Sequence, residues 1–203
     1  MENRHGDLIK TVSFPVSVTA TTLAVIGVIG NIFVIVVVFK YTNLWRQLTC
    51  KYVVNQSFID AVTLVVLFLR LRVVPADDVL LAGMDESWAD LYCRTWGSPL
   101  LLYGLLLSSI YNLVAISVER YLAIVHPLWH KVSFTPRKVS MSITTIWLSG
   151  IVYMAFVVGI TSTVVNGKCH PVSNWSSQGV QKMTAGITLC VSLVVPVLIH
   201  AFW

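Results

Sequence analysis

Long apolar runs recur along this chain, and they limit its fold more than any other feature. A run of about 20 apolar residues is the length that an α-helix needs to cross the hydrocarbon core of a bilayer. Within that core every backbone polar group must be bonded inside the structure, which a helix achieves by itself. The sequence therefore predicts an all-α membrane protein, a single domain over residues 1–203, with spans at about 14–39, 52–74, 95–125, 139–160 and 180–203.

The composition points to the same environment. Charged residues make up only 11% of the chain and the mean hydropathy is +0.78, whereas an ordinary soluble domain has about 25% charged residues. The net charge of +5 comes from lysines and arginines that are scattered among the turns. They do not gather with aromatic residues into a stripe that binds phosphates. The lipid bilayer is therefore the expected partner, and nucleic acid is excluded.

Ionisable side chains are rare in the apolar runs, which makes the few that occur informative. Asp60 lies near the middle of the second run, and Glu119 with Arg120 comes near the end of the third. An ionisable group inside a span is costly and is usually functional. Asp60 is therefore predicted to face the interior of a helix bundle and to hold an ion, a proton or a polar partner.

The stretch from Ser117 to Trp129 reads Ser-Val-Glu-Arg-Tyr-Leu-Ala-Ile-Val-His-Pro-Leu-Trp. It closely resembles the end of the third helix and the start of the second intracellular loop of rhodopsin-like G-protein-coupled receptors. The resemblance implies that the chain supplies five transmembrane helices of a seven-helix receptor bundle. It also implies a heterotrimeric G protein as a partner.

The same resemblance assigns roles to residues of this stretch. Glu119, Arg120 and Tyr121 match the motif that takes part in G-protein coupling, and Glu119 would hold Arg120 in the resting state. Pro127 and Leu128 resemble the loop segment that docks into a hydrophobic pocket of the G protein.

Polar residues in other runs match the same family. Gly30-Asn31 resembles the start of the first-helix pattern Gly-Asn-x-x-Val, and a buried amide in lipid is expected to bond to a neighbouring helix. Trp147 matches the tryptophan of the fourth helix. Asn55 and Asn112 are the expected partners of its indole N–H, since a buried Trp usually finds an acceptor.

The segment from Asn55 to Asp60 is similar to the family pattern Asn-Leu-Ala-x-x-Asp, with Gln56 and Ser57 in place of Leu-Ala. In the family this aspartate takes part in a sodium site, and Ser109 matches a serine of that site. The resemblance therefore implies a sodium ion at Asp60 and Ser109 if the bundle is complete. No other cofactor or metal is expected.

Residues 161–170 carry the clearest local signal outside the membrane. β-Branched residues run into Asn166-Gly167, and Asn-Gly between strand-like segments favours a type I′ hairpin. The resemblance implies that this β-hairpin lies in the second extracellular loop. It also implies that a Cys93–Cys169 disulfide pins the hairpin over the top of the third helix.

The third span departs from the family pattern at its start. Trp88 followed by Cys93 resembles the first extracellular loop and its bridging cysteine, but Cys93 lies about two residues farther from Arg120 than in the family. Pro99 falls in what would be the first turns of the helix.

The orientation follows from the cysteines and a sequon. Lysines and arginines number seven on each side of the predicted membrane, so the positive-inside rule does not decide the orientation. Asn174-Trp-Ser176 is a glycosylation sequon, which predicts a glycan on Asn174. Together with the disulfide it belongs in the oxidising lumen or outside. The expected protein is a multi-pass plasma-membrane protein with an extracellular N-terminus.

The third run also bears on the ligand. Receptors for charged amines in this family use an aspartate about five turns before the motif arginine. That position falls on Leu102, beside Tyr103, and no Asp or Glu occurs between Thr95 and Val118. An amine is therefore disfavoured, and Leu102 and Tyr103 are expected in the ligand pocket.

The acidic loop over residues 70–94 and the hairpin favour a neuropeptide or peptide hormone, with a lipid or another small molecule as the alternative.

The resemblance also implies a sixth and a seventh helix, which the 203 residues do not contain. The chain is therefore expected to be a fragment, either an incomplete gene model or a truncated isoform, that cannot signal alone.

Three other interpretations of the sequence are an intramembrane protease, a transporter subunit and a metal site. Ser149 with His200 is the only pair that could suggest an intramembrane serine protease, and it lacks a glycine-rich oxyanion loop. A transporter subunit would show inverted repeats with broken helices, and none is visible. His126 and His130 have a metal-like spacing, but Pro127 lies between them and no third ligand is near. The chain is not expected to be an enzyme.

Overall fold

The computed structural model describes residues 14–41, 44, 47–72, 85–98, 100–161, 163–165, 168–170 and 177–190. Its elements are, in chain order, α1 (Phe14–Lys40), α3 (Leu48–Arg72), α5 (Glu86–Tyr92), the π-helical turn η1 (Cys93–Gly97), α6 (Leu100–Val125), α7 (Pro127–Ser133), α8 (Pro136–Thr161), β1 (Thr163–Val165), β2 (Lys168–His170) and α9 (Gln178–Leu189).

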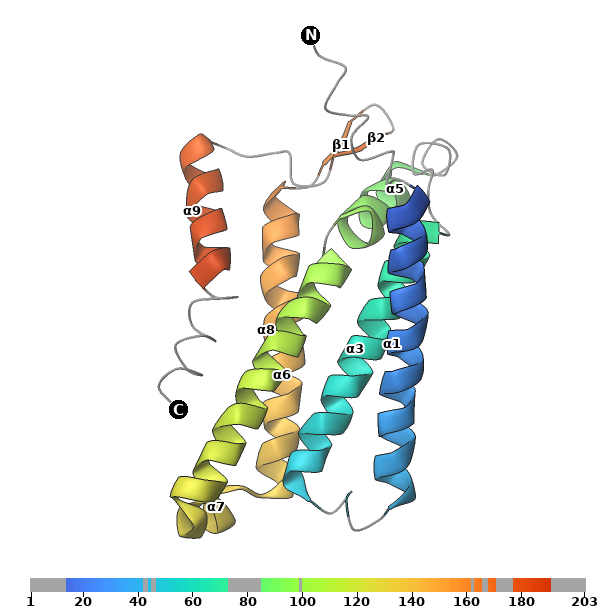
Figure 1. The fold of residues 1–203 in the computed structure, drawn as a ribbon. Helices are drawn as coiled ribbons and strands as arrows, with labels where there is room; N and C mark the ends of the chain where they lie inside the picture. Colours follow the sequence, from blue (N-terminus) through green and yellow to red (C-terminus); the bar gives the residue numbers. More distant parts are fainter. Residues whose placement is uncertain are drawn as a thin grey trace.

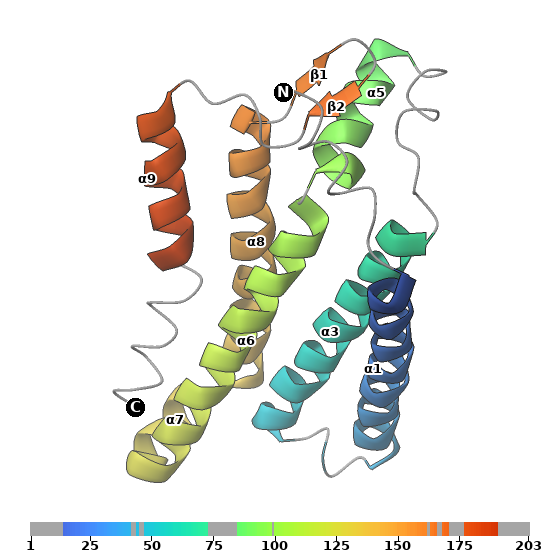
Figure 2. The ribbon, with the colours of Figure 1, turned by 45° about the horizontal axis from the view of Figure 1, so that its top comes forward.

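Four stretches of the described chain are helical, long and apolar enough to cross a membrane: Val18–Lys40, Leu48–Leu71, Glu86–Val125 and Pro136–Gly159. Figure 1 shows the four long helices α1, α3, α6 and α8 running between the same two ends of a bundle. Each packs on the next in that order. The strands and α5 lie at one end, called here the strand end, and α7 lies at the other, the α7 end (Figures 1 and 2).

The predicted spans agree with the observed helices to within a few residues in three cases. α1 covers the first predicted run, α3 begins at Leu48 instead of residue 52, and α8 begins at Pro136 instead of residue 139. Proline is well tolerated at the first position of a helix because it has no N–H to leave unbonded. Thr135 caps α8, since its hydroxyl accepts a hydrogen bond from Lys138 N at 3.4 Å.

The third span begins differently from the prediction. Residue 95, the expected start, lies within η1, and the transmembrane helix α6 begins only at Leu100. Ser98 between them has extended backbone angles, φ −87° and ψ 166°, as residues before proline usually do. A π-helical turn is wider than an α-helical one. This turn and the break at Ser98 therefore take up the extra residues between Cys93 and the end of α6.

β1 and β2 pair in antiparallel register, with Val164 opposite Cys169 and Val165 opposite Lys168. The connecting residues 166–167 lie outside the described residues, so the predicted turn type remains a prediction. Of the fifth predicted span, residues 180–203, the structure describes α9 up to Leu189 and Cys190. α9 contacts α8 through the hydroxyls of Tyr153 and Thr188, 2.7 Å apart.

The helices α6 and α8 approach each other closely at Gly150. A Cβ added to Gly150 would lie 2.6 Å from the carbonyl oxygen of Gly104 and closer still to Ser108 Oγ. Small residues let helices in a membrane approach closely. The outer face of α1, in contrast, exposes large apolar side chains such as Leu23, Ile29 and Phe33. Such a surface fits a lipid environment.

Candidate functional site

Glu119 is the most buried charged residue of the described chain, at 2% exposure, and it lies near the α7 end of α6. Thr49 on α3 donates a hydrogen bond from its hydroxyl to Glu119 Oε2 at 2.8 Å. His130 on α7 places Nε2 3.0 Å from Glu119 Oε1. The carboxylate therefore joins three elements, α3, α6 and α7, at a single point.

Arg120 is oriented differently from its neighbour. Its Nε lies 4.0 Å from Glu119 Oε2, and its side chain is 65% exposed whereas that of Glu119 is 3% exposed. Consecutive residues on a helix do not face each other. The predicted Glu119–Arg120 pair is thus present only at a long distance, and the short contacts of Glu119 go to His130 and Thr49.

Sequence reasoning missed His130 because it considered that histidine only as a metal ligand. The ring of His130 stacks on Phe134, with centroids 4.7 Å apart. α7, which begins at Pro127 directly after the end of α6, brings the ring back under Glu119. Glu119 and His130 are 11 residues apart and lie on different helices, so the spacing did not indicate that they meet.

Apolar side chains are exposed at the α7 end. Leu128 is 83% exposed, Val132 is 79% exposed and Ile124 is 78% exposed. Pro127 occupies the first turn of α7. The predicted coupling residues Arg120 and Leu128 therefore lie exposed at the same end of the bundle.

A chain of hydrogen bonds crosses the middle of the bundle. Trp147 on α8 donates from its indole nitrogen to Asn55 Oδ1 on α3 at 3.0 Å, as the sequence predicts. Asn55 Nδ2 donates to Asn112 Oδ1 on α6 at 2.8 Å. Asn112 Nδ2 then donates to Gln56 Oε1 at 2.9 Å and to the carbonyl of Tyr52 at 3.0 Å. Asn112 is fully buried.

The chain of hydrogen bonds ends at Asp60. Gln56 Nε2 lies 3.0 Å from each carboxylate oxygen of Asp60 and also contacts Ser109 Oγ. The Ser109 hydroxyl donates to Asp60 Oδ1 at 2.9 Å. The structure thus brings Asp60 and Ser109 together, as the sodium prediction requires.

The sodium ion at these residues stays a prediction. Hard cations are bound by oxygen ligands, and in this structure Gln56 Nε2 lies against the oxygens of Asp60 and Ser109 that would face an ion.

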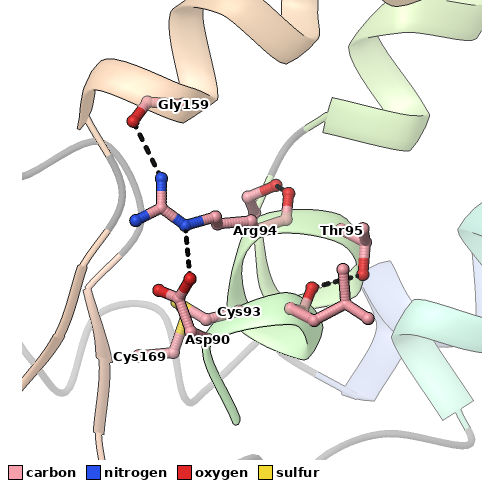
Figure 3. Close-up of polar contacts among 8 residues, drawn as sticks. Asp90, Cys93, Arg94, Thr95, Gly159 and Cys169 are labelled. Atoms are coloured by element: carbon pink, nitrogen blue, oxygen red, sulfur yellow. Dashed lines mark hydrogen bonds and ion pairs between the residues drawn. A yellow bond between two sulfur atoms is a disulfide. The ribbon is translucent and has the colours of Figure 1, made fainter. Parts of the chain in front are cut away.

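A disulfide joins Cys93 of η1 to Cys169 of β2 at the strand end, with 5.4 Å between the Cα atoms (Figure 3). This is the bridge that the family resemblance implies. Gly97, in the same π-helical turn, lies against it, because an added Cβ would come within 2.9 Å of Cys169 Sγ. The turn is therefore packed directly on the bridge.

Two arginines that sequence reasoning did not single out hold the segment before α6. Arg94 forms an ion pair with Asp90 at 2.7 Å and donates from Nη1 to the carbonyl of Gly159 at 2.8 Å, near the end of α8 (Figure 3). A cation near a helix C-terminus is favourable. Arg70 on α3 donates to the carbonyl of Ser98.

The remaining predicted site residues lie apart from these contacts. Asn31 donates to the carbonyl of Gly27 at 2.9 Å in its own helix, which differs from the interhelical bond that the sequence predicts. A carbonyl four residues back can satisfy a polar side chain without a neighbouring helix. Leu102 is half-buried and Tyr103 is 55% exposed.

Other predictions fall on parts of the chain that the structure does not describe. Asn174, Pro99 and His200 lie outside the described residues, as do residues 73–84 of the acidic loop. The rest of the predicted loop, residues 70–94, is not a loop apart from Asp85, because it falls in α3, α5 and η1. Ser149, the protease candidate, donates its hydroxyl to the carbonyl of Ile146 on its own helix at 2.9 Å.

Comparison with known proteins gives consistent matches. The family model for the 7 transmembrane receptor (rhodopsin family) matches residues 30–203. The histamine H2 receptor of Rattus norvegicus is 33% identical over 136 residues, which are 67% of this chain and 36% of that protein. The octopamine receptor beta-2R of Chilo suppressalis is 29% identical over 147 residues, which are 72% of this chain and 35% of that protein.

A third relative is the GQ-coupled rhodopsin of Mizuhopecten yessoensis, which is 29% identical over 138 residues, 67% of this chain and 26% of that protein. The chain therefore spans about a third of the length of the first two relatives, or less for the third.

Proposed function

Because the chain belongs to the rhodopsin family of seven-transmembrane receptors, we propose that it transmits the binding of an extracellular ligand to a heterotrimeric G protein. Members of this family are receptors and not enzymes. The observation that carries the proposal is the placement of Glu119-Arg120-Tyr121 near the α7 end, opposite the disulfide that holds the strand end. Ligand and G protein would act at these two opposite ends.

The exposed side chains at the α7 end are the proposed contact surface for the G protein. Arg120 is 65% exposed and Leu128 is 83% exposed. A guanidinium beside a projecting apolar side chain offers the partner one charged and one hydrophobic contact. Exposed apolar side chains beside polar groups are typical of protein-interaction sites.

Because the 203 residues are expected not to signal alone, guanine-nucleotide exchange on a heterotrimeric G protein tests this surface in membranes that contain a seven-helix receptor of which they form a part. We expect Arg120→Ala and Leu128→Ala each to lower ligand-driven exchange at least tenfold. Leu23→Ala, on the exposed outer face of α1, is the matched control and should leave exchange unchanged. Exchange by Arg120→Ala at the unaltered rate would refute the coupling role.

The proposed ligand is a peptide, such as a neuropeptide or peptide hormone. α6 carries no Asp or Glu from Leu100 to Val118, so the helix offers no carboxylate to pair with an ammonium group near Leu102 and Tyr103. The acidic residues before α6 suit a basic peptide. We place the β-hairpin and the fifth span around the proposed ligand pocket at Leu102 and Tyr103.

A small amine is the second candidate, because two relatives are named as receptors for histamine and octopamine. A panel of peptides and biogenic amines separates the two candidates. Exchange driven by peptides alone supports the first. Exchange driven by an amine at micromolar concentration would overturn it.

A further inference from the structure

The hydrogen bonds between Trp147 and Asp60 run in one direction, and both ends fix that direction. An indole N–H can only donate, and an ionised carboxylate can only accept. Starting from Trp147, Asn55 must therefore accept with its oxygen and donate with its nitrogen, and Asn112 must do the same. The oxygen of Gln56 then faces Asn112 and its nitrogen faces Asp60.

The nitrogen of Gln56 contacts three oxygens at once. It lies 3.0 Å from both oxygens of Asp60 and within hydrogen-bond distance of Ser109 Oγ. Ser109 uses its own hydrogen toward Asp60 Oδ1, so its oxygen accepts from Gln56. The two N–H groups of Gln56 thus face the three oxygens that Asp60 and Ser109 could offer to a cation from this side.

We propose that the side-chain amide of Gln56 replaces a sodium ion at Asp60, so that the polar layer of this bundle closes without a cation. The amide supplies hydrogen-bond donors where an ion would supply positive charge, and its orientation is fixed by the three residues Trp147, Asn55 and Asn112. The proposal concerns the interior of the bundle and does not depend on ligand class or on G-protein coupling.

The chain offers a direct test through substitutions at Gln56. Gln56→Leu and Gln56→Ala both remove the donor nitrogen and leave the oxygens of Asp60 and Ser109 in place. Asn112 Nδ2 keeps the carbonyl of Tyr52 as an acceptor in either variant, so neither substitution leaves that nitrogen without a partner. Adding Asp60→Asn to each variant provides the control without a carboxylate.

The measurement is the melting temperature of the purified chain in lipid nanodiscs, with sodium chloride exchanged for choline chloride at constant ionic strength. We expect the unaltered protein to melt at the same temperature in both salts. The Gln56→Leu and Gln56→Ala proteins should gain about 3–6 °C at a sodium concentration ten times their dissociation constant. Adding Asp60→Asn should abolish that gain.

Two outcomes would overturn the proposal. One is a rise with sodium in the unaltered protein that Asp60→Asn removes, because the ion would then bind beside Gln56. The other is indifference to sodium in both folded variants, with helicity checked by circular dichroism. In that case Gln56 is not what keeps the cation out.

Discussion

The Glu119 carboxylate makes its short contacts with residues other than Arg120, its neighbour in the sequence. Its two oxygens are bonded to Thr49 and His130, and Arg120 extends outward at 65% exposure. In this state the guanidinium is available to a partner at the α7 end while the acid remains buried.

His130 is expected to stabilise the protein through this contact. Truncation in His130→Ala leaves Glu119 Oε1 without that partner, and a buried acceptor without a partner costs about 1–3 kcal/mol or more. Since the His130 side chain is 20% exposed, water can reach the vacated oxygen, and we expect a loss near the lower end of that range. Thermal unfolding in nanodiscs measures it.

His126→Ala is the matched control for this experiment. His126 is exposed and makes no side-chain capping bond in α7, so its truncation should leave the melting temperature unchanged. His130→Gln, which keeps a donor, should recover part of the loss. Equal stability of His130→Ala and the unaltered protein would show that water replaces the histidine fully.

Residue chemistry also decides which contacts the sequence could predict. The Trp147–Asn55 bond was predictable because an indole needs an acceptor and the family pattern supplied Asn55. The role of Gln56 was not, because its bonds depend on the register of α3 against α6. The bond predicted from Asn31 to a neighbouring helix is not the one observed, because the amide donates to a carbonyl of its own helix.

Among the elements, α6 and α8 approach each other closely where glycine and serine face each other, at Gly104, Ser108 and Gly150. Gly150→Ala places a methyl group against Gly104 and Ser108, and overpacking of this kind costs about 1–3 kcal/mol. Gly159→Ala lies on the same helix with nothing within 4 Å of the added Cβ. We expect the first variant to melt at a lower temperature than the unaltered protein and the second to melt at the same temperature or slightly higher.

This pair separates packing from helix propensity, because both variants replace glycine by alanine in α8. A shift of the same size and sign in both would contradict the close contact between α6 and α8. Double substitution of Gly150→Ala with Ser108→Gly should restore part of the loss, since the hydroxyl is the nearest obstacle.

The disulfide ties β2 to η1 across a separation of 76 residues. Bridges over long loops typically contribute about 2–4 kcal/mol, so Cys169→Ser should lower the melting temperature of the chain markedly. Cys190→Ser is the matched control, because Cys190 is a free, exposed thiol. Comparable losses in both variants would mean that the bridge adds no stability.

At the element scale the helices were predictable from apolar run length. The break before α6 had a local signal, because a residue before proline, such as Ser98, favours an extended backbone. The π-helical turn η1 had none: Gly97 packs against Cys169 and Arg70 bonds to Ser98, and both contacts join segments far apart in the sequence.

At the scale of the whole molecule, Figure 2 shows α5 and the strands at one end of the bundle and α7 at the other. The disulfide on β2 and Arg120 near the end of α6 therefore lie at opposite ends. We expect a glycan on Asn174 on the extracellular side and Arg120 on the cytoplasmic side. In intact cells, peptide N-glycosidase F should shift the electrophoretic mobility of the unaltered protein and not that of Asn174→Gln. In a protein that also carries Cys50→Ser and Cys190→Ser, which removes the free thiols, Arg120→Cys should react with an impermeant maleimide only after permeabilisation. Labelling of this variant in intact cells would contradict the predicted orientation.

The break at Ser98 affects how the molecule sits in the bilayer. The apolar helical stretch from Glu86 to Val125 has 40 residues, which would measure about 60 Å as one continuous rod, twice the thickness of the hydrocarbon layer at about 30 Å. The break leaves α6 to cross the lipid, and we expect α5 to lie among the phospholipid head groups. Trp88, 65% exposed, would then lie at the level that indole rings favour. We therefore expect α5, anchored at the membrane surface, to set how deeply α6 is inserted in the bilayer.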